Sequence, residues 1–370
     1  MKLKGKDMNL VGFDYINQKD KDLSYEFINN TTIKKYILGI NALSKSVLKY
    51  IEVDGIIDDF TRVQSSRKKD ILDIKDVPKD SIILCTAQGS PLEVQNRLES
   101  MGYTSFSYLS FYRYSNLTLK ATDFILDFKN DFLENEKNYL WIYNLLNDKK
   151  SKEVFTKILN FKQTFDLEFM NGFTNNFKEQ YFDKELIKKS NNIVFVDGGG
   201  YVGDTLPSIM EFYKDFKKII LIEPNTLHIN IAKRDFGHIS NIEFINCGLG
   251  KEKSNIQDDN KSQNNCNHNY QALNINTIDN LIHEQIDFLK LDIEGAESDT
   301  IIGAKKTIKK YHPILAICIY HKAKHWYEVP TLVLDIRDDY NIYIRHYMEG
   351  IYETVMYFIP RINLNSARIE

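Results

Sequence analysis

The feature that most constrains this chain is a glycine-rich turn between an apolar run and a segment with helical periodicity. Residues 193–196 form a short run of Ile, Val and Phe, and Gly198, Gly200 and Gly203 follow with the spacing G-x-G-x-x-G. Because glycine has no Cβ, it lets the backbone turn sharply and lets a ligand lie close against the chain. In its strand–turn–helix context, this loop favours a nucleoside-binding site over an ordinary turn.

Acidic residues near the loop indicate which nucleoside cofactor it would take. Glu223 ends the next apolar run, 26 positions after Asp197, where a carboxylate can accept both hydrogens of a ribose diol. Asp197 before the loop and Asp204 after it would repel the pyrophosphate of a dinucleotide. They suit the amino group and sulfonium of S-adenosylmethionine instead. For Asp204, an N-cap of the following helix is an equal alternative.

Apolar runs and helical patterns alternate over residues 191–360, which predicts a doubly wound, mostly parallel sheet that ends in an antiparallel hairpin. The predicted strands are 193–196, 219–222, 242–245, 288–291, 314–319, 343–347 and 352–358. The predicted helices are 204–216, 226–235, 296–309 and 328–338. A tight turn at Glu349-Gly350 would join the last two strands, and residues 251–269 are expected to form a polar loop.

The remainder of the chain predicts two further regions. Residues 1–115 show strand, helix, strand, strand and helix patterns, so they predict a small Rossmann-like α/β domain for acceptor recognition or assembly. Residues 116–190 show only helical periodicity and predict a helical connector. The third domain is then 191–360. Asp58-Asp59 resembles the acid position of small nucleotide-sugar-binding domains, whereas only Gly39 of their glycine signature is present.

Composition excludes several classes of function. The net charge of −3 argues against a protein that coats nucleic acid or an anionic membrane. The four cysteines are far apart and form no CxxC, so we expect reduced thiols, no zinc site and a cytoplasmic protein. No signal-peptide pattern and no run of 18 apolar residues is present, so we expect no membrane span.

Polar residues also follow the fourth and fifth predicted strands. Asp292, Glu294 and Glu297 lie within six residues, at the edge where open α/β sheets bind ligands. They could hold a hydroxyl, a cation or a metal, although a helix N-terminus also attracts acids. His321 ends the fifth strand and is a candidate general base, with a structural histidine as the alternative. Candidates to line an acceptor pocket are His325, Trp326, Arg345 and His346.

Together these residues resemble the FkbM family of S-adenosylmethionine-dependent methyltransferases. The resemblance covers about residues 150–360, and it rests on 196–199, 203–205, 223–225, 290–297, Tyr320-His321, 345–347 and 353–355. Residues 180–182 resemble longer family members, and the match is poorest at the Asn-rich stretch 255–270. The family implies a class I methyltransferase fold with a seven-stranded sheet.

The resemblance also implies roles for individual residues. The cofactor would contact Asp197, Gly198, Gly199, Tyr201, Gly203, Asp204, Thr205, Glu223, Asn225, Gly248 and Asp292. Catalysis would fall to His321, Asp292 and Glu294, and the acceptor would meet Tyr181, Glu297, His325, Trp326, Arg345 and His346. No metal ligand is assigned.

The resemblance therefore implies an O-methyltransferase that methylates a hydroxyl of a sugar or sugar nucleotide, in bacterial surface polysaccharide biosynthesis. The expected partner is this small-molecule acceptor, and the sequence is also compatible with a homodimer. Two alternatives are kept: a non-catalytic nucleotide-sugar-binding protein and an NAD-dependent oxidoreductase. The paired acids at the loop speak against the second alternative.

Overall fold

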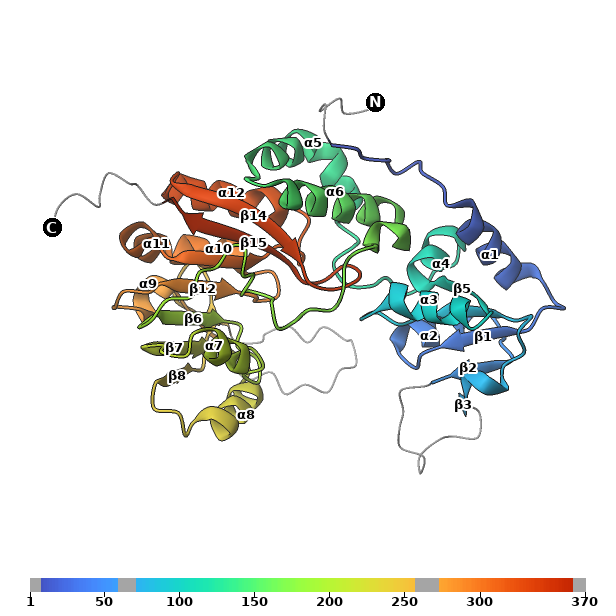
Figure 1. Ribbon diagram of the computed structural model, residues 1–370, viewed down its shortest axis with the longest axis horizontal. Helices are drawn as coiled ribbons and strands as arrows, with labels where there is room; N and C mark the ends of the chain where they lie inside the picture. Colours follow the sequence, from blue (N-terminus) through green and yellow to red (C-terminus); the bar gives the residue numbers. More distant parts are fainter. Residues whose placement is uncertain (1–7, 59–70, 257–272, 362–370) are drawn as a thin grey trace. The chain divides into compact units, whose positions relative to one another are not determined.

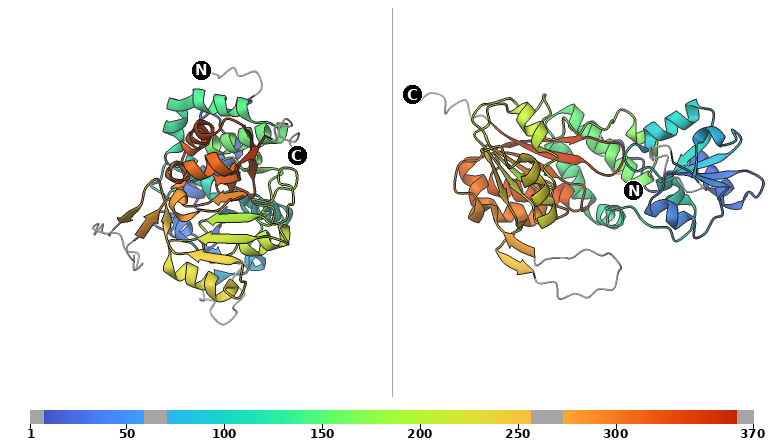
Figure 2. Two further views of the ribbon diagram at one scale, coloured as in Figure 1. Left: turned by 90° about the vertical axis from the view of Figure 1, so that its left-hand side faces the viewer. Right: turned by 90° about the horizontal axis from the view of Figure 1, so that it is seen from below.

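The computed structural model describes residues 8–58, 71–256 and 273–361 (Figure 1, Figure 2). The chain divides into two compact units, each built from several stretches of sequence. Unit 1 comprises residues 1–133, 153–176 and 346–352, and unit 2 comprises residues 134–152, 177–345 and 353–370. We describe the two units separately.

Unit 1 contains a five-stranded parallel sheet in the order β3-β2-β1-β4-β5. Its strands are β1 (Lys35–Leu38), β2 (Gly55–Ile57), β3 (Ile71–Leu72), β4 (Ile82–Cys85) and β5 (Thr104–Ser107). Its helices are α1 (Gln18–Asn29), α2 (Ala42–Val47), η1 (Ile74–Asp76), α3 (Pro91–Ser100), α4 (Tyr108–Tyr114) and η2 (Leu167–Met170).

The sheet of unit 1 is buried on both faces. Along β4, Ile82 and Leu84 pack into one apolar cluster, whereas Ile83 and Cys85 pack into another. Successive side chains of a strand point to opposite faces, so a continuous apolar run is what a sheet covered on both sides requires. This explains why the short runs of the first region form central strands.

Two long helices join the units. Helix α5 (Phe128–Leu145) has a non-helical backbone at Asn135, and helix α6 (Lys149–Thr164) follows it. The division between the units falls within both helices, at residues 133/134 and 152/153. The range 116–190, predicted as a helical connector, therefore contributes residues to both units.

Unit 2 contains a seven-stranded sheet in the order β14-β15-β13-β12-β6-β7-β8. Its strands are β6 (Val194–Gly198), β7 (Lys218–Ile222), β8 (Ile242–Ile245), β12 (Phe288–Leu291), β13 (Ile314–Cys318), β14 (Tyr340–His346) and β15 (Thr354–Pro360). The strands from β8 to β13 are parallel, and β15 runs antiparallel to β13. The prediction of a mostly parallel, doubly wound sheet that ends antiparallel is confirmed.

The helices of unit 2 lie against its large sheet (Figure 2). They are α7 (Leu206–Phe212), α8 (Thr226–Phe236), α9 (Ile278–Leu281), α10 (Glu297–Gly303), α11 (Lys305–Tyr311) and α12 (His325–Ile336). The single helix predicted over 296–309 is wrong, because the chain breaks between α10 and α11. A Cβ on Gly303 would lie 2.1 Å from the carbonyl oxygen of Gly250, so this helix end packs directly on backbone.

A second, three-stranded sheet in unit 2 was not predicted. It has the order β10-β11-β9, with β9 (Gly248–Leu249), β10 (Ser254–Ile256) and β11 (Leu273–Asn276), and in Figure 2 β10 and β11 extend away from the large sheet. The predicted loop over 251–269 is therefore wrong at 254–256. The rest of that prediction, with Cys266 and the Asn-rich stretch beyond residue 256, lies outside the described residues.

Three smaller expectations can be compared with the described residues. Seven residues, 347–353, separate β14 from β15, so the predicted tight turn at Glu349-Gly350 is wrong. Cys85, Cys247 and Cys318 are buried free thiols. In the part of the chain that the structure describes, none of the helices has the length and apolar character needed to cross a membrane.

Candidate active site

Most of the predicted cofactor and catalytic residues lie at the carboxyl edge of the large sheet of unit 2. Strand β6 is the middle one of the five parallel strands, with β7 on one side and β12 on the other. The connections from these neighbours leave in opposite directions, which makes the β6/β12 edge a topological switch point. Open α/β sheets bind their ligands in the crevice at such a point.

The glycine loop after β6 is packed tightly against the backbone that follows β12. Gly199 has a φ of +78°, and a Cβ there would lie 1.8 Å from the carbonyl oxygen of Asp292. Only glycine fits this position. The N–H groups of Gly199 and Gly200 both donate to the carbonyl oxygen of Ile222, at 2.9 and 3.1 Å. The loop is therefore hydrogen-bonded to the end of β7 and packed against the residue that follows β12.

Glu223 is the first residue after β7; its side chain is buried, and each of its carboxylate oxygens accepts a backbone hydrogen bond. Oε2 accepts from the N–H of Tyr201 at 3.0 Å, and Oε1 accepts from the N–H of Asn225 at 2.9 Å. Asn225 in turn caps helix α8 through its side chain. The Tyr201 ring is 51% exposed and lies edge-on to His228, with ring centroids 4.3 Å apart. A carboxylate has about four lone-pair directions, so Glu223 retains capacity for a ligand hydroxyl.

Asp197 forms a buried ion pair beneath the glycine loop. It lies beside Lys290 on adjacent strands, and Nζ of Lys290 is 2.8 Å from Oδ1 of Asp197. The same ammonium group donates to the carbonyl oxygen of Gly199 at 2.7 Å. Burial lowers the pKa of Lys290, but the carboxylates of Asp197 and Asp292 outweigh this and raise its pKa above the ordinary value. Lys290 therefore links Asp197 to the loop, and the ion pair helps to hold the loop in place.

The residues that begin helix α7 resolve one open alternative. The N-cap is Thr205, and its side chain makes no capping hydrogen bond. Asp204 precedes it with an exposed side chain, so the N-cap alternative for Asp204 is not realised. Gly203 is buried with a φ of +83°, and Gly198 is the last residue of β6. Gly248 is buried in β9.

Asp292 comes directly after β12 and accepts hydrogen bonds from two tyrosine hydroxyls. The hydroxyl of Tyr181 donates to Oδ2 at 2.9 Å, and the hydroxyl of Tyr320 donates to Oδ1 at 3.2 Å. The Asp292 side chain keeps 23% exposure. Glu294 follows in a left-handed conformation, with φ +54°, and its side chain is 81% exposed. The turn therefore presents two carboxylates to the edge of the sheet.

His321 lies between carboxylates, with its two ring nitrogens in different surroundings. Nδ1 is 2.9 Å from Oε1 of the fully buried Glu297, whereas Nε2 is 3.4 Å from Oδ1 of Asp292 and 3.6 Å from Oε2 of Glu294. Oε1 of Glu297 also accepts from the N–H of Ile293 at 3.0 Å. Burial lowers the pKa of His321, but the bond to Glu297 and the nearby carboxylates outweigh this and raise its pKa above the ordinary value.

The remaining predicted acceptor residues lie in buried surroundings. His325 and Trp326 are fully buried in α12, and Nδ1 of His325 is 3.3 Å from Oε2 of Glu297. Burial lowers the pKa of His325 to about 4. Arg345 is buried, with its guanidinium 2.7 Å from Asp148 and 2.9 Å from Asp183. The structure brings these three residues to the interior of unit 2.

His346 belongs to the other unit. It lies edge-on to Phe173 in unit 1, with ring centroids 4.8 Å apart. Burial and the charge of Lys162 lower the pKa of His346 to about 3. The structure thus keeps this imidazole neutral and packed within unit 1.

Two acids and one histidine have a spacing that a metal ion could bridge. Asp292, Glu297 and His321 each offer one atom, and these atoms lie within 4.8 Å of one another. Glu297 and His321 are already within hydrogen-bond distance, and Asp292 is occupied by two tyrosine hydroxyls. Hydrogen bonds between these groups therefore account for the cluster as it stands.

Three residues that the structure places at this site lie in the family-like stretches but were assigned no role from the sequence: Glu353, Lys290 and Tyr320. The carboxyl group of Glu353 is hydrogen-bonded to the amide of Gln180. Burial first, and then the charge of Asp292, raise the pKa of Glu353 to about 7. Lys290 could have been found from the sequence, because a lysine within the apolar run 288–291 indicates a buried charge that needs a partner.

The strand order and the switch-point site define a class I methyltransferase fold. Residues 195–347 match the model of the family described as the methyltransferase FkbM domain. Residues 195–347 therefore carry an FkbM methyltransferase domain, and the chain also contains a further α/β unit. The family match favours methyl transfer over the oxidoreductase alternative.

A solved structure shares this fold over most of the chain. The methyltransferase FkbM from Methylobacillus flagellatus KT is 22% identical, with a TM-score of 0.73, and the match covers 93% of this chain and 94% of that chain. Weaker matches include an rRNA methylase from Streptococcus thermophilus (15% identity, TM-score 0.33, covering 47% and 90%). Another is a SAM-dependent methyltransferase from Aquifex aeolicus (15%, 0.32, 52% and 97%). No curated protein matches the chain.

Proposed function

We propose that the protein transfers a methyl group from S-adenosylmethionine to a hydroxyl oxygen of a sugar or sugar nucleotide. The observation that carries this proposal is His321. Its Nδ1 is held by a buried carboxylate, and its Nε2 faces the carboxylates of the switch-point edge. This arrangement provides a base for a hydroxyl acceptor. In line with the family, such acceptors would arise in bacterial surface polysaccharide biosynthesis.

The chemistry of the loop residues fits S-adenosylmethionine. Glu223 is a fixed carboxylate at the end of β7 and would accept hydrogens from ribose hydroxyls. Asp204, Asp292 and Glu294 make the edge acidic, which suits an amino group and a sulfonium but repels a pyrophosphate. The cation Lys290 is buried and paired with Asp197. Tyr201, partly exposed beside His228, is placed to cover one side of the nucleoside.

The protein residues would supply alignment and a proton acceptor. The bound sulfonium makes its methyl carbon electrophilic. Neutral His321 donates Nδ1–H to Glu297, so the lone pair of Nε2 can take the acceptor's hydroxyl proton. The acceptor oxygen then bonds to the methyl carbon as the carbon–sulfur bond breaks, and sulfur keeps that electron pair. Asp292 and Glu294 would orient the acceptor by accepting its other hydroxyl hydrogens.

The direct test replaces the proposed base. His321→Ala should lower turnover about 10²–10⁴-fold, because a positioned base contributes that much. Affinity for S-adenosylhomocysteine should change little, because His321 holds the acceptor side. Methyl transfer from labelled S-adenosylmethionine to a panel of sugars and sugar nucleotides measures the first quantity, and calorimetry measures the second. His238→Ala, at an exposed histidine of the same unit, is the matched control.

A second pair of variants tests the cofactor side. Glu223→Ala should weaken binding of S-adenosylhomocysteine about 10–100-fold, since a hydrogen bond to a charged group contributes about 1.5–3 kcal/mol. Glu211→Ala, at an exposed acid on α7, should leave binding unchanged. Full affinity in Glu223→Ala would remove the ribose assignment. Binding without turnover on any acceptor would instead favour a non-catalytic protein.

Chelation separates the base from a metal-assisted mechanism. If His321 acts as the base, a chelator should leave turnover unchanged. A loss that Mg²⁺ or Mn²⁺ restores would assign Asp292, Glu297 and His321 to an ion, whose charge would then lower the pKa of the acceptor hydroxyl.

A further inference from the structure

A segment that precedes the large sheet of unit 2 contributes a tyrosine to the candidate active site. Phe182 anchors this segment in the core, where its ring packs against those of Phe195 and Phe212, with centroids 6.1 and 5.3 Å apart. Tyr181 beside it has a φ of +70°, and its N–H donates to the hydroxyl of Tyr357 in β15 at 3.0 Å. Residues other than glycine rarely adopt this left-handed conformation, and where they do, the strain is often found at a functional site.

The hydrogen bonds at the Tyr181 hydroxyl have a defined direction. The side-chain amide of Gln180 donates to this hydroxyl at 2.9 Å and also to Oε2 of Glu353. Because the hydroxyl oxygen accepts from the amide, its own proton is available for another acceptor. Oδ2 of Asp292 lies 2.9 Å away, and Sγ of Cys318 lies 3.4 Å away. The carboxylate oxygen is the stronger acceptor, so Tyr181 donates to Asp292.

Asp292 is thereby held through both of its oxygens. Tyr181 donates to Oδ2, and Tyr320, which follows β13, donates to Oδ1 at 3.2 Å. One donor on each oxygen fixes the plane of the carboxylate and leaves a lone pair on each oxygen for a ligand. Oδ1 also lies 3.4 Å from Nε2 of His321. The orientation of Asp292 relative to the proposed base therefore depends on the two tyrosines.

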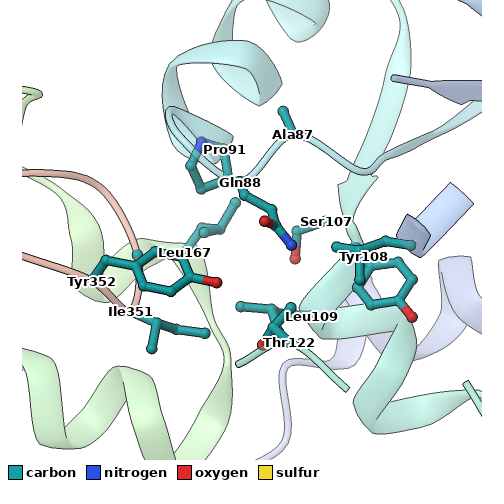
Figure 3. A pocket seen from close by; sticks show the side chains of 12 residues that line it. Ala87, Gln88, Pro91, Ser107, Tyr108, Leu109, Thr122, Leu167, Ile351 and Tyr352 are labelled. Carbon is teal, nitrogen blue, oxygen red and sulfur yellow. The ribbon is translucent and has the colours of Figure 1, made fainter. Parts of the chain in front are cut away.

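A tyrosine in unit 1 shows the structural use of a buried hydroxyl. Tyr108 lines a cavity of about 30 Å³, and in Figure 3 its hydroxyl points away from that cavity. The hydroxyl donates to the backbone carbonyl oxygen of Lys120 at 2.6 Å. Tyr181 is as well buried, at 4% exposure, yet its hydroxyl donates to a side chain of the candidate active site. A phenylalanine could fill the same space but could not hold Asp292, so the site and not the packing explains this hydroxyl.

We propose that Tyr181 is a positioning residue that fixes the carboxylate of Asp292 in the orientation that receives the acceptor. This inference rests on the proposed function, in which Asp292 orients the acceptor. Gln180 and Glu353 orient the Tyr181 hydroxyl in turn. Because Tyr181 is buried, it acts through Asp292 and does not touch the acceptor, in contrast to the role that the family resemblance implied.

The kinetic test is a double-mutant cycle on the full chain. Tyr181→Phe should lower turnover about 10–100-fold, because it removes a hydrogen bond to a charged group. Affinity for S-adenosylhomocysteine should stay unchanged. With Asp292→Ala already in place, Tyr181→Phe should lower turnover by less than about twofold, because the group that it positions is gone. Equal losses in both backgrounds would show that Tyr181 acts on the fold as a whole, and the proposal would be wrong.

Two further variants serve as control and second probe. Tyr340 is also buried in unit 2, and its hydroxyl donates to the carbonyl oxygen of Pro313, the residue before β13, at 2.8 Å. Tyr340→Phe should therefore lower the melting temperature but leave turnover unchanged. Gln180→Leu removes the amide that orients Tyr181 and should lower turnover about three- to tenfold, the range that a neutral hydrogen bond contributes. Full turnover in Gln180→Leu would contradict the proposed chain of hydrogen bonds.

A measurement without any acceptor separates this inference from the proposed function. In protein saturated with S-adenosylhomocysteine, the ¹⁵N resonance of Nε2 of His321 reports on Asp292, whose Oδ1 is 3.4 Å away. Tyr181→Phe should move this resonance at constant pH, and Tyr340→Phe should not. If no acceptor is methylated but the resonance moves, the proposed function fails and Tyr181 still holds Asp292. A resonance that stays in place in Tyr181→Phe refutes the positioning role, whether or not an acceptor is methylated.

Discussion

The parallel strands of the two units follow the same order, yet the carboxyl edges of their sheets have opposite chemistry. Unit 1 has the order β3-β2-β1-β4-β5, and unit 2 repeats it as β8-β7-β6-β12-β13. In each, a glycine with positive φ follows the first strand, Gly39 at +105° and Gly199 at +78°. Asn41 then ties the edge of unit 1 to Thr86 by a neutral bond of 2.8 Å. A buried ion pair, Asp197–Lys290, holds the edge of unit 2.

This difference teaches that topology places a site without choosing its chemistry. Both switch points are concave by construction. In unit 1, uncharged Asn41 and the carboxylate of Glu349 bind the first N–H groups of α2 and α3. In unit 2, the edge carries Glu223 after β7, and Asp292 and Glu294 beside His321. The charges at the second edge are costly to bury, so they also make that edge more sensitive to substitution.

The largest expected effect is on stability, and it comes from a comparison of the Asp197–Lys290 ion pair of unit 2 with the Asn41 hydrogen bonds of unit 1. Lys290→Met should destabilise unit 2 by about 3–5 kcal/mol, because it leaves the buried carboxylate of Asp197 unpaired. Asn41→Ala should destabilise unit 1 by only about 1 kcal/mol, the usual cost of losing a helix cap. Urea unfolding monitored by hydrogen exchange reads each unit separately.

A double variant checks the reason for the larger effect. Lys290→Met combined with Asp197→Leu should recover most of the lost stability, because a packed apolar pair can replace a buried ion pair. If the two costs simply added, each residue would be acting alone and the comparison between charged and neutral edges would fail.

A smaller effect is expected from the two glycines. Gly199→Ala should cost about 2–4 kcal/mol and abolish cofactor binding, because its Cβ would overlap the backbone oxygen of Asp292 at 1.8 Å. Gly39→Ala should cost about 1–2 kcal/mol, because its Cβ would meet a side-chain oxygen of Thr86 at 2.7 Å. Circular dichroism melts and calorimetry with S-adenosylhomocysteine measure both. If the two substitutions lower the free energy of unfolding equally, the positive φ shared by both glycines would matter more than the contact of the added Cβ.

Much of the large sheet could be predicted because its central strands are short, continuous apolar runs. The predicted strands 242–245 and 288–291 coincide with β8 and β12. Strands of two or three residues, such as β3 and β9, were missed because so short a segment has no periodicity to detect. The break after Gly303 was missed because it depends on contact with Gly250, which is distant in sequence.

The position of the site could be predicted from the sequence, but the burial and the partners of its side chains could not. Strand ends placed His321, Asp292 and Glu223 at one edge, which is a consequence of topology. Their burial and partners depend on residues far along the chain. Arg345, predicted to meet the acceptor, is engaged by Asp148, 197 positions away. Glu297, also predicted to meet the acceptor, lies behind His321, because α10 turns its first residue inward.

The smallest effect we predict concerns pH. Turnover should rise with pH through the pKa of His321, since only the neutral imidazole can accept a proton. The wild-type midpoint should lie above the ordinary histidine value, because Glu297 and nearby carboxylates outweigh the effect of burial. Glu297→Gln removes one of those charges, so the midpoint should move to lower pH. Maximal turnover should fall about tenfold, because the glutamine still accepts Nδ1–H but no longer stabilises the imidazolium.

Steady-state pH profiles with S-adenosylmethionine and an active acceptor measure this shift, with Glu211→Gln as the matched control. The free energy of unfolding gives a second readout with a defined sign. A raised histidine pKa adds stability below its unfolded value, and this is lost as pH rises through the folded value. Glu297→Gln should therefore cost more stability at pH 5 than at pH 9.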